Sequence, residues 1–272
     1  MPKIALLQMT SGIDPEANFD TITAAAREGA GEGASALFTP EMALLLDRNR
    51  SRAGQWISSE RPSEMIERLS RLASDLEIDI CLGSAPVAGG GDKYANRTFY
   101  LPASGTPPIT YDKIHMFDVE LSTGETWRES GAYQAGDKVV TVEDTPVGRL
   151  GLTICYDMRF PALFEALGQR KCDAIAVPAA FTKPTGEAHW HVLLRARAIE
   201  ASAFVIAAAQ IGKHEDGRET YGHSLVVDPW GNVLLDMGGE QAGLAFCDID
   251  LGRIAEVRAQ VPSLANRRKI PN

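Results

Sequence analysis

Hydrophobic and polar positions follow two alternating patterns along the whole chain. Residues 3–9 form an apolar run that is typical of a buried strand, and residues 18–27 repeat apolar positions at the spacing of an amphipathic helix. The same alternation continues to the C-terminal end. It predicts further strands over 35–39, 79–86, 97–101, 109–113, 139–142, 149–155, 173–179, 204–210, 224–227, 233–235 and 243–249, and further helices over 62–76, 161–169 and 188–201, with a short helix after 249.

Alternating strands and helices predict a layered α/β architecture, and the additional hairpin-like strands indicate mixed sheets and sheet-on-sheet packing. No linker rich in proline and serine interrupts residues 1–272, so we expect a single domain. Residues 115–137 lack a clear period and are predicted to form a long loop. Because long loops inside compact domains are commonly functional, the polar residues of this segment are candidates for a site.

Composition and charge exclude several classes of protein. The 272 residues are 44% hydrophobic and 23% charged, and 27 basic against 36 acidic residues give a net charge of -9, which disfavours nucleic acid or an anionic membrane as partner. The apolar run near the N-terminus is too short for a signal peptide, and no run of about 18 apolar residues occurs, so we expect a cytoplasmic protein. The glycine-rich segment 29–33 lacks the spacing of a dinucleotide fingerprint, and no cofactor is predicted.

The cysteines are widely separated and show neither CxxC nor Cys/His ligand spacing. This pattern disfavours a zinc site or a redox pair and leaves a thiol free for chemistry. The four residues are Cys81, Cys155, Cys172 and Cys247.

Cys155 stands at the most distinctive point of the sequence, between an apolar strand and a helix that Pro161 opens. A strand-to-helix elbow exposes the side chain at its apex, and the next backbone amide, that of Tyr156, can point toward a developing oxyanion. The alternative is a buried, inert cysteine, since free cysteine is among the most buried residue types.

Two charged residues stand at the ends of other predicted strands. Glu41 follows Thr39 and Pro40 at the end of an apolar strand, where ligands gather in open α/β sheets, and a carboxylate there is a candidate general base. Lys113 ends the strand at 109–112, and a partly buried ammonium there would stabilise an oxyanion. The alternative for both residues is a solvated charge at a strand end.

Three segments resemble the signature blocks of the nitrilase superfamily of carbon-nitrogen hydrolases. They are FTPE at 38–41, YDKIHMFD at 111–118 and LTICYDMRFP at 152–161, in the order Glu, Lys, Cys. The resemblance implies a four-layer αββα sandwich with two mixed sheets, a site that uses no metal, and pairing into a homodimer or larger assembly. It also implies a C-terminal extension, about residues 258–272, of the kind that packs against a partner subunit; the alternative for this segment is a disordered basic tail. Further resembling segments lie at 178–181, 186–190, 194–200, 221–224 and 227–231.

The resemblance also implies roles for individual residues. Glu41 corresponds to the general base, Lys113 to the cation near the tetrahedral intermediate, and Cys155 to the nucleophile. Glu129 matches the second active-site glutamate, which would support Lys113 and position substrate or water; taken by itself it reads as a solvated loop carboxylate. Attack of the thiol on an amide would give a thioester and ammonia, and water activated by Glu41 would then hydrolyse the thioester.

The segments at 188–190, 193–200 and 207–210 are most similar to the Nit-like group, which includes deaminated glutathione amidases and ω-amidases. This similarity implies a small amide substrate that carries a carboxylate. His191 departs from the pattern, because many relatives carry glutamate at that position. The alternatives are a nitrilase, an N-carbamoyl amino acid amidohydrolase, or a binding protein without catalytic activity.

Four further residues are candidates for substrate binding. Arg159 would bind a carboxylate through two hydrogen bonds, or else form a structural salt bridge at the elbow. Phe181 and Thr182 follow a predicted strand end and are expected to line the pocket with Tyr156. A metal pair between His189 and His191 is disfavoured, since residues two apart on a helix face different directions.

Overall fold

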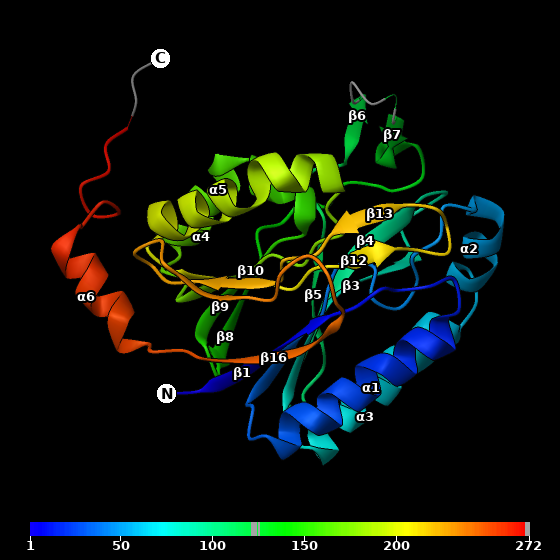
Figure 1. The fold of residues 1–272 in the computed structure, drawn as a ribbon, viewed down its shortest axis with the longest axis horizontal. Helices are drawn as coiled ribbons and strands as arrows, with labels where there is room; N and C mark the ends of the chain where they lie inside the picture. The colour runs from blue at the N-terminus through cyan, green and yellow to red at the C-terminus, as the bar shows by residue number, and fades with distance from the viewer. Residues whose placement is uncertain (121–123, 125, 270–272) are drawn as a thin grey trace.

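The computed structural model describes residues 1–120, 124 and 126–269, and two six-stranded mixed sheets form its centre (Figure 1). The first sheet has the order β16-β1-β2-β3-β4-β5, in which β1, β2 and β3 are parallel and the other pairs are antiparallel. Its strands are β1 (Lys3–Gln8), β2 (Ala36–Phe38), β3 (Asp79–Ala88), β4 (Tyr94–Leu101), β5 (Ile109–Asp112) and β16 (Gly243–Asp248).

The second sheet has the order β15-β14-β11-β10-β9-β8, with β9, β10 and β11 parallel. Its strands are β8 (Thr141–Thr145), β9 (Gly148–Leu152), β10 (Ala174–Ala176), β11 (Phe204–Ala207), β14 (Leu225–Val227) and β15 (Val233–Asp236). Helices α1 (Pro15–Gly31) and α3 (Arg61–Asp75) cover the first sheet, and α4 (Pro161–Gln169) and α5 (Lys183–Ala201) lie beside the second (Figure 1). The four-layer αββα sandwich with two mixed sheets is therefore confirmed.

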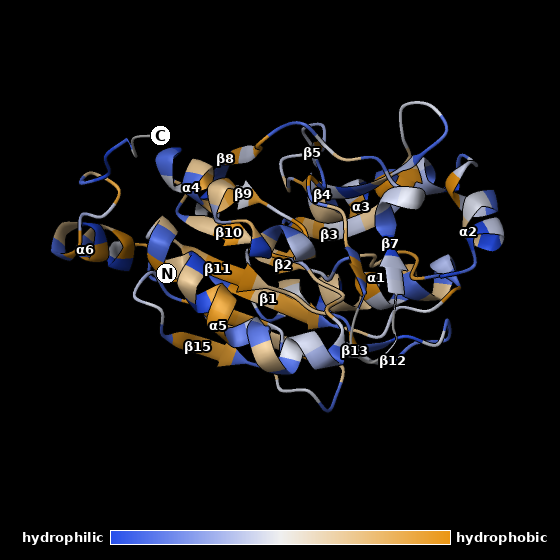
Figure 2. Cartoon of the chain, turned by 90° about the horizontal axis from the view of Figure 1, so that it is seen from above, coloured by the Kyte–Doolittle hydropathy of each residue, from blue (hydrophilic) through white to orange (hydrophobic). Residues whose placement is uncertain are grey.

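Strand β1 shows why these strands read as continuous apolar runs. Ile4 and Leu6 belong to the core shared with the second sheet, whereas Ala5 and Leu7 pack in the core beneath α1 and α3. Successive side chains of a strand point to opposite faces, so a sheet covered on both sides needs apolar residues at every position. The central strands are accordingly hydrophobic in Figure 2, while the helices alternate with hydrophilic positions.

Several boundaries and short elements differ from the prediction. Helix α1 begins three residues early because the Asp14 side chain accepts from the Glu16 N–H and caps it. Helix α5 begins at Lys183 rather than at residue 188. Helix α2 (Arg50–Ile57) and the hairpin of β12 (Ile211–Lys213) and β13 (Glu219–Tyr221) were not predicted.

The prediction of a structureless loop over residues 115–137 was wrong. This segment contains the hairpin of β6 (Asp118–Glu120) and β7 (Thr126–Arg128), followed by a 3₁₀ helix at Glu129–Gly131. The Asp118 carboxylate accepts from the Ser130 N–H at 3.0 Å and closes the segment on itself.

The C-terminal extension that we expected over 258–272 begins inside helix α6 (Gly252–Gln260). Within it, Leu264 lies against Gly168 and Arg267 pairs with Glu165 at 3.3 Å, so it contacts α4 of its own chain. Residues 270–272 lie outside the described residues. Within the described ranges, no helix is both long enough and apolar enough to span a membrane.

Candidate active site

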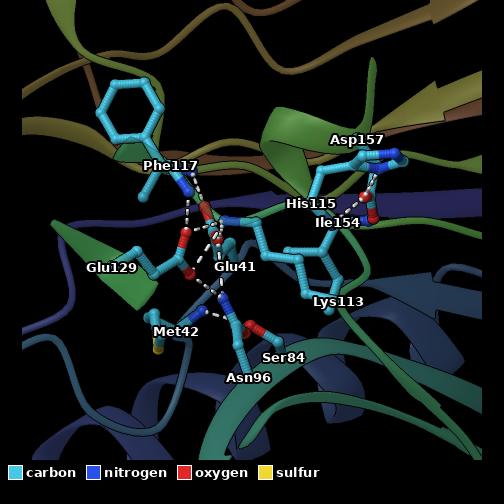
Figure 3. A network of polar contacts seen from close by, with 12 residues as sticks. Glu41, Met42, Ser84, Asn96, Lys113, His115, Phe117, Glu129, Ile154 and Asp157 are labelled. Carbon is cyan, nitrogen blue, oxygen red and sulfur yellow. Dashed lines mark hydrogen bonds and ion pairs between the residues drawn. The ribbon is translucent and has the colours of Figure 1, made fainter. Parts of the chain in front are cut away.

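The four candidate catalytic side chains line one cavity of about 290 Å³. Glu41 follows β2, Lys113 follows β5, Glu129 opens the 3₁₀ helix after β7, and Cys155 follows β9. They come from four separate segments, and the fold places them together between the two sheets. Figure 3 shows Lys113 extending toward the carboxylates of Glu41 and Glu129.

A close approach between β2 and β3 positions Glu41. A Cβ atom on Gly83 would lie 2.1 Å from the Thr39 carbonyl oxygen and 2.4 Å from that of Pro40, so only glycine fits there. Directly after Glu41, Met42 adopts a φ of 56°, and its N–H donates to Ser84 Oγ at 2.8 Å. The turn holds the Glu41 carboxylate, 5% exposed, inside the molecule.

The Lys113 ammonium is buried between two carboxylates. Its Nζ donates to Glu41 Oε1 at 2.9 Å and to both oxygens of Glu129, at 3.0 and 2.9 Å. Burial lowers the pKa of Lys113, but the negative charges of Glu129 and Glu41 outweigh burial and raise that pKa well above its ordinary value. Lys113 is therefore a fixed positive charge in the cavity.

Glu41 is held by two further hydrogen bonds to its carboxylate. Asn96 Nδ2 donates to Oε1 at 2.9 Å, and the Ala180 N–H donates to Oε2 at 2.9 Å. Burial raises the pKa of Glu41, but the charge of the Lys113 ammonium and hydrogen bonds from Lys113, Cys155 and the Ala180 N–H lower it by more, so the pKa lies below its ordinary value. Glu41 is therefore ionised at neutral pH.

Cys155 is in the opposite state, because burial raises the pKa of its thiol well above the ordinary value and the Glu41 carboxylate raises it further, against the effect of Lys113. The proton thus resides on sulfur, and an ionised carboxylate is available beside it. This is the arrangement that a general base requires before it activates a nucleophile.

The predicted elbow at Cys155 is present in the structure. Strand β9 ends at Leu152, a 3₁₀ helix spans Cys155–Arg159, and α4 begins at Pro161. Cys155 has a φ of 47°, which L-residues other than glycine rarely adopt, and its N–H donates to the Pro178 carbonyl at 2.8 Å. Such a strained backbone position persists only where surrounding contacts hold it, and it commonly marks a functional residue.

Asp157, which the sequence analysis did not select, holds the elbow against the lysine segment. Its fully buried carboxylate accepts from the Ile154 N–H at 2.9 Å, the Tyr111 hydroxyl at 2.6 Å and the His115 N–H at 3.0 Å. Tyr111 and His115 flank Lys113 in the sequence. Asp157 therefore fixes the segment that carries Cys155 against the segment that carries Lys113. The available signal was an acidic residue two positions after the nucleophile, within a largely apolar segment.

Glu129 is not a solvated loop carboxylate. Besides its contacts with Lys113, it accepts from the Phe117 N–H at 2.6 Å and from Asn96 Nδ2 at 3.3 Å. Asn96 thus donates to both glutamates from the middle of β4, and it is a second residue that sequence reasoning missed. A neutral amide in a buried strand was the available signal.

The predicted substrate-binding residues divide into two groups. Tyr156, Phe181 and Thr182 line the cavity. Arg159 is not among the lining residues; its guanidinium lies 3.3 Å from His189 Nδ1 and 5.1 Å from the centre of the Phe181 ring. It forms no salt bridge with any residue in the described part of the chain. 

Other arginines line the cavity in place of Arg159. Two of their guanidinium groups contact Trp127, that of Arg48 at 4.4 Å and that of Arg218 at 5.2 Å from the ring centre. Apart from the catalytic group of Glu41, Lys113 and Glu129, the cavity is lined by four arginines and two carboxylates, so basic residues outnumber acidic ones in the remaining lining. The arginines are Arg48, Arg50, Arg128 and Arg218, and the carboxylates are Asp47 and Glu219.

The sequence profile of the carbon-nitrogen hydrolase family matches residues 3–259. The chain belongs to this family. This confirms the resemblance and identifies the protein as an enzyme that cleaves carbon-nitrogen bonds. Among curated relatives of this hydrolase, the deaminated glutathione amidase of Bos taurus is 38% identical over 272 residues, which cover 98% of this chain and 82% of the relative.

Solved structures agree with the family assignment. The hydrolase matches the C. elegans NitFhit protein with a TM-score of 0.91 and 35% identity; the match covers 98% of this chain but 65% of that longer one. It also matches an amidase from Nesterenkonia sp. AN1, an E41Q mutant with acrylamide added at its active-site cysteine, with a TM-score of 0.80 and 27% identity over 96% of this chain and 98% of that chain.

Proposed function

We propose that the hydrolase cleaves the carbon-nitrogen bond of a small amide that carries a carboxylate, of the deaminated glutathione or ω-amide type, and releases ammonia. The observation that carries this proposal is the cavity in which the Cys155 thiol meets the Glu41 carboxylate and the Lys113 ammonium. The relatives named as deaminated glutathione amidases support the substrate class.

In the first half of the reaction, Glu41 accepts the thiol proton while Cys155 Sγ attacks the carbonyl carbon of the amide. The carbonyl electrons move onto oxygen, and the Lys113 ammonium and the Tyr156 N–H stabilise the resulting oxyanion. As the tetrahedral intermediate collapses, the carbon-nitrogen bond breaks and Glu41 returns its proton to the departing nitrogen. Ammonia leaves, and the acyl group remains as a thioester on Cys155.

In the second half, Glu41 accepts a proton from water, and the hydroxyl attacks the thioester. Collapse of the second intermediate expels the Cys155 thiolate, which recovers the proton from Glu41. Lys113 keeps its charge throughout, because Glu129 remains hydrogen-bonded to it while Glu41 is neutral. Glu129 thus keeps Lys113 protonated while Glu41 gains and loses its proton.

A panel of substrates tests the proposed function. Ammonia release is measured with carboxylate-bearing amides, N-carbamoyl amino acids and nitriles, with Cys155→Ala as the control. We expect release from the amides by the wild type and none by the variant. Release from nitriles alone would overturn the amidase assignment in favour of a nitrilase, and release from carbamoyl compounds alone would favour an N-carbamoyl amino acid amidohydrolase. No release from any member would support a non-catalytic binding protein.

The arginines beside Trp127 are proposed to bind the substrate carboxylate. Charge-assisted hydrogen bonds contribute about 1.5 to 3 kcal/mol, so Arg48→Met is expected to raise KM for a carboxylate-bearing amide about tenfold or more. KM for a neutral amide should not change, since the lost interaction involves the carboxylate alone. Steady-state kinetics with both substrates measures the difference, and Arg27→Met on the exposed side of α1 is the control. Equal effects of Arg48→Met on both amides would exclude this role.

We also propose that the chain forms a homodimer through the outer face of α5 and the turn between β14 and β15. Val192 and Ile199 are 68% and 50% exposed and stand seven residues apart on α5, and Trp230 is 45% exposed. The turn packs on the helix, since a Cβ on Gly231 would lie 2.7 Å from Ile199 Cδ1. Exposed apolar groups gathered in this way are typical of an interface.

Light scattering tests the dimer. The wild type is expected at twice the chain mass of 29.4 kDa, and Val192→Asp is expected to shift it toward the monomer. Ala24→Asp, on the exposed side of α1, should leave the mass unchanged. A monomeric wild type at micromolar concentration would contradict this proposal.

A further inference from the structure

Outside the catalytic cavity, three ionisable side chains from distant parts of the chain meet. His191 lies on α5, His223 follows β13, and Asp236 ends β15. His191 Nε2 is 2.8 Å from Asp236 Oδ2, and His223 Nδ1 is 2.9 Å from Asp236 Oδ1. One nitrogen of each histidine and one carboxylate oxygen all lie within 4.8 Å of one another. None of the three residues lines the catalytic cavity.

Tyr221 packs beside both histidine rings. Its ring is stacked on His223, with centres 4.4 Å apart, and meets His191 edge-on at 6.3 Å. Tyr221 in turn packs against Gly186 on α5, where a Cβ atom would lie 2.3 Å from Tyr221 Cγ. The segment that carries His223 is thereby packed against the helix that carries His191.

Backbone contacts leave the facing atoms of His223 and Asp236 available. The Trp190 indole N–H donates to the His223 carbonyl at 2.8 Å, and the His223 N–H donates to the Gly238 carbonyl at 2.8 Å. The second ring nitrogen of His223 lies close to Gly239, where a Cβ would be 2.9 Å from Nε2. The Gly238 N–H donates to Asp236 Oδ1 at 2.9 Å. His223 Nδ1 and His191 Nε2 therefore both face the Asp236 carboxylate.

We propose that His191, His223 and Asp236 form a binding site for a divalent transition metal ion of the zinc type. Two imidazole nitrogens and one carboxylate oxygen are ligands that zinc accepts, and three protein ligands leave a fourth tetrahedral position open to solvent. Imidazole ligands disfavour Mg²⁺ and Ca²⁺, which prefer an all-oxygen shell.

The geometry requires only a small adjustment. Zinc-nitrogen bonds of about 2.0 to 2.1 Å place tetrahedral donor atoms about 3.4 Å apart. The donor atoms of the cluster already lie within 4.8 Å of one another, so any movement needed to reach that separation is small. The side chains of His191 and His223 are 34% and 24% exposed, so an ion can reach them from solvent. On binding, each imidazole carries its proton on the nitrogen away from the metal, and the carboxylate exchanges two hydrogen bonds for one bond to the ion.

His189 provides a matched comparison on the same helix. It faces Arg159, at 3.3 Å, and is not part of the cluster. His189 and His191, two residues apart on the helix, therefore face different directions, as expected from the sequence. The partners of His191 come instead from residues that are distant in sequence.

Titration calorimetry with ZnCl₂ on the full chain tests the site. We expect one zinc ion per chain for the wild type, and binding weakened by at least about 100-fold in His191→Gln and Asp236→Asn, because each removes a ligand. His189→Gln should bind as the wild type does. Cys155→Ala should also bind normally, which separates this site from capture of zinc by the catalytic thiol. MgCl₂ should give no binding.

Thermal unfolding in EDTA confirms that each variant folds, and added zinc is expected to raise Tm of the wild type but not of His191→Gln. His223→Asn serves as a further variant, since asparagine tolerates the φ of 55° at this position. The proposal would be overturned by unchanged zinc affinity in folded His191→Gln, by loss of binding in Cys155→Ala, or by no binding to the wild type at millimolar zinc.

Discussion

Glu41→Gln is expected to lower kcat/KM for amide hydrolysis by about 10³-fold, within the range for removal of a general base. The amide has the shape of the carboxylate but cannot accept the Cys155 proton, so the thiol with its raised pKa remains protonated and a poor nucleophile. Hydrolysis of the thioester loses the same base. The fold should persist, because Lys113 keeps its ion pair with Glu129.

Steady-state ammonia release measures this change, and circular dichroism with thermal unfolding checks the fold. Glu67→Gln is the control, since it removes an exposed glutamate of α3 whose side chain is 71% accessible. A folded Glu41→Gln enzyme within tenfold of the wild-type kcat/KM would exclude Glu41 as the base. The experiment tests only the role of Glu41 as general base, because the variant retains both Cys155 and Lys113.

Lys113→Met is expected both to abolish turnover and to lower the free energy of unfolding by about 3 to 5 kcal/mol. The substitution removes the cation that would stabilise the oxyanion. It also leaves the buried carboxylate of Glu41 and the partly exposed carboxylate of Glu129 without their shared partner, and breaking a largely buried ion pair in this way leaves uncompensated charge. The loss should far exceed that of Lys213→Met, which removes an exposed lysine at the end of β12.

The sign of the pH dependence distinguishes this cause from general misfolding. In the wild type the pKa of Glu41 is lowered, so its contribution to stability is present above the unfolded pKa and is lost as pH falls through the folded pKa. Without Lys113, burial raises the pKa of the Glu41 carboxylate above its unfolded value, and stability is then lost as pH rises. Urea unfolding at about pH 7.5 and about pH 5 should therefore show the larger deficit at the higher pH. A deficit that is equal at both values, or larger at acid pH, would contradict this account.

The hydrophobic pattern failed mainly to predict several short helices and strands. Strands β6 and β7 span three residues each, which is too short for a period of two to show, and their pairing depends on contacts such as that of Asp118 with Ser130. Helix α2 has eight residues and three buried ones, which is too few for a helical period. Elements of this size are stabilised by what they pack against, and local sequence carries little of that information.

Arg159 and Arg48 illustrate a second limit. Arg159, four residues after Cys155, was predicted to bind the substrate carboxylate. Its guanidinium instead faces His189, and Arg159 is not among the residues that line the cavity. Arg48 and Arg218, which both contact the Trp127 ring, come from segments far apart in the chain. Proximity in sequence to a nucleophile therefore did not indicate proximity to its pocket.

The sequence by itself determined the layered α/β class, the elbow at Cys155 and the strand-end positions of Glu41 and Lys113, because apolar runs, prolines and turn residues act over a few neighbouring positions. Only the tertiary structure decided the ionisation of these groups, the hydrogen bonds of Asn96 to two glutamates, and the meeting of His191 with His223 and Asp236. The physical reason is range: charge interactions and hydrogen bonds depend on burial and on separations of about 3 to 4 Å, which are set between strands and helices and not along the chain.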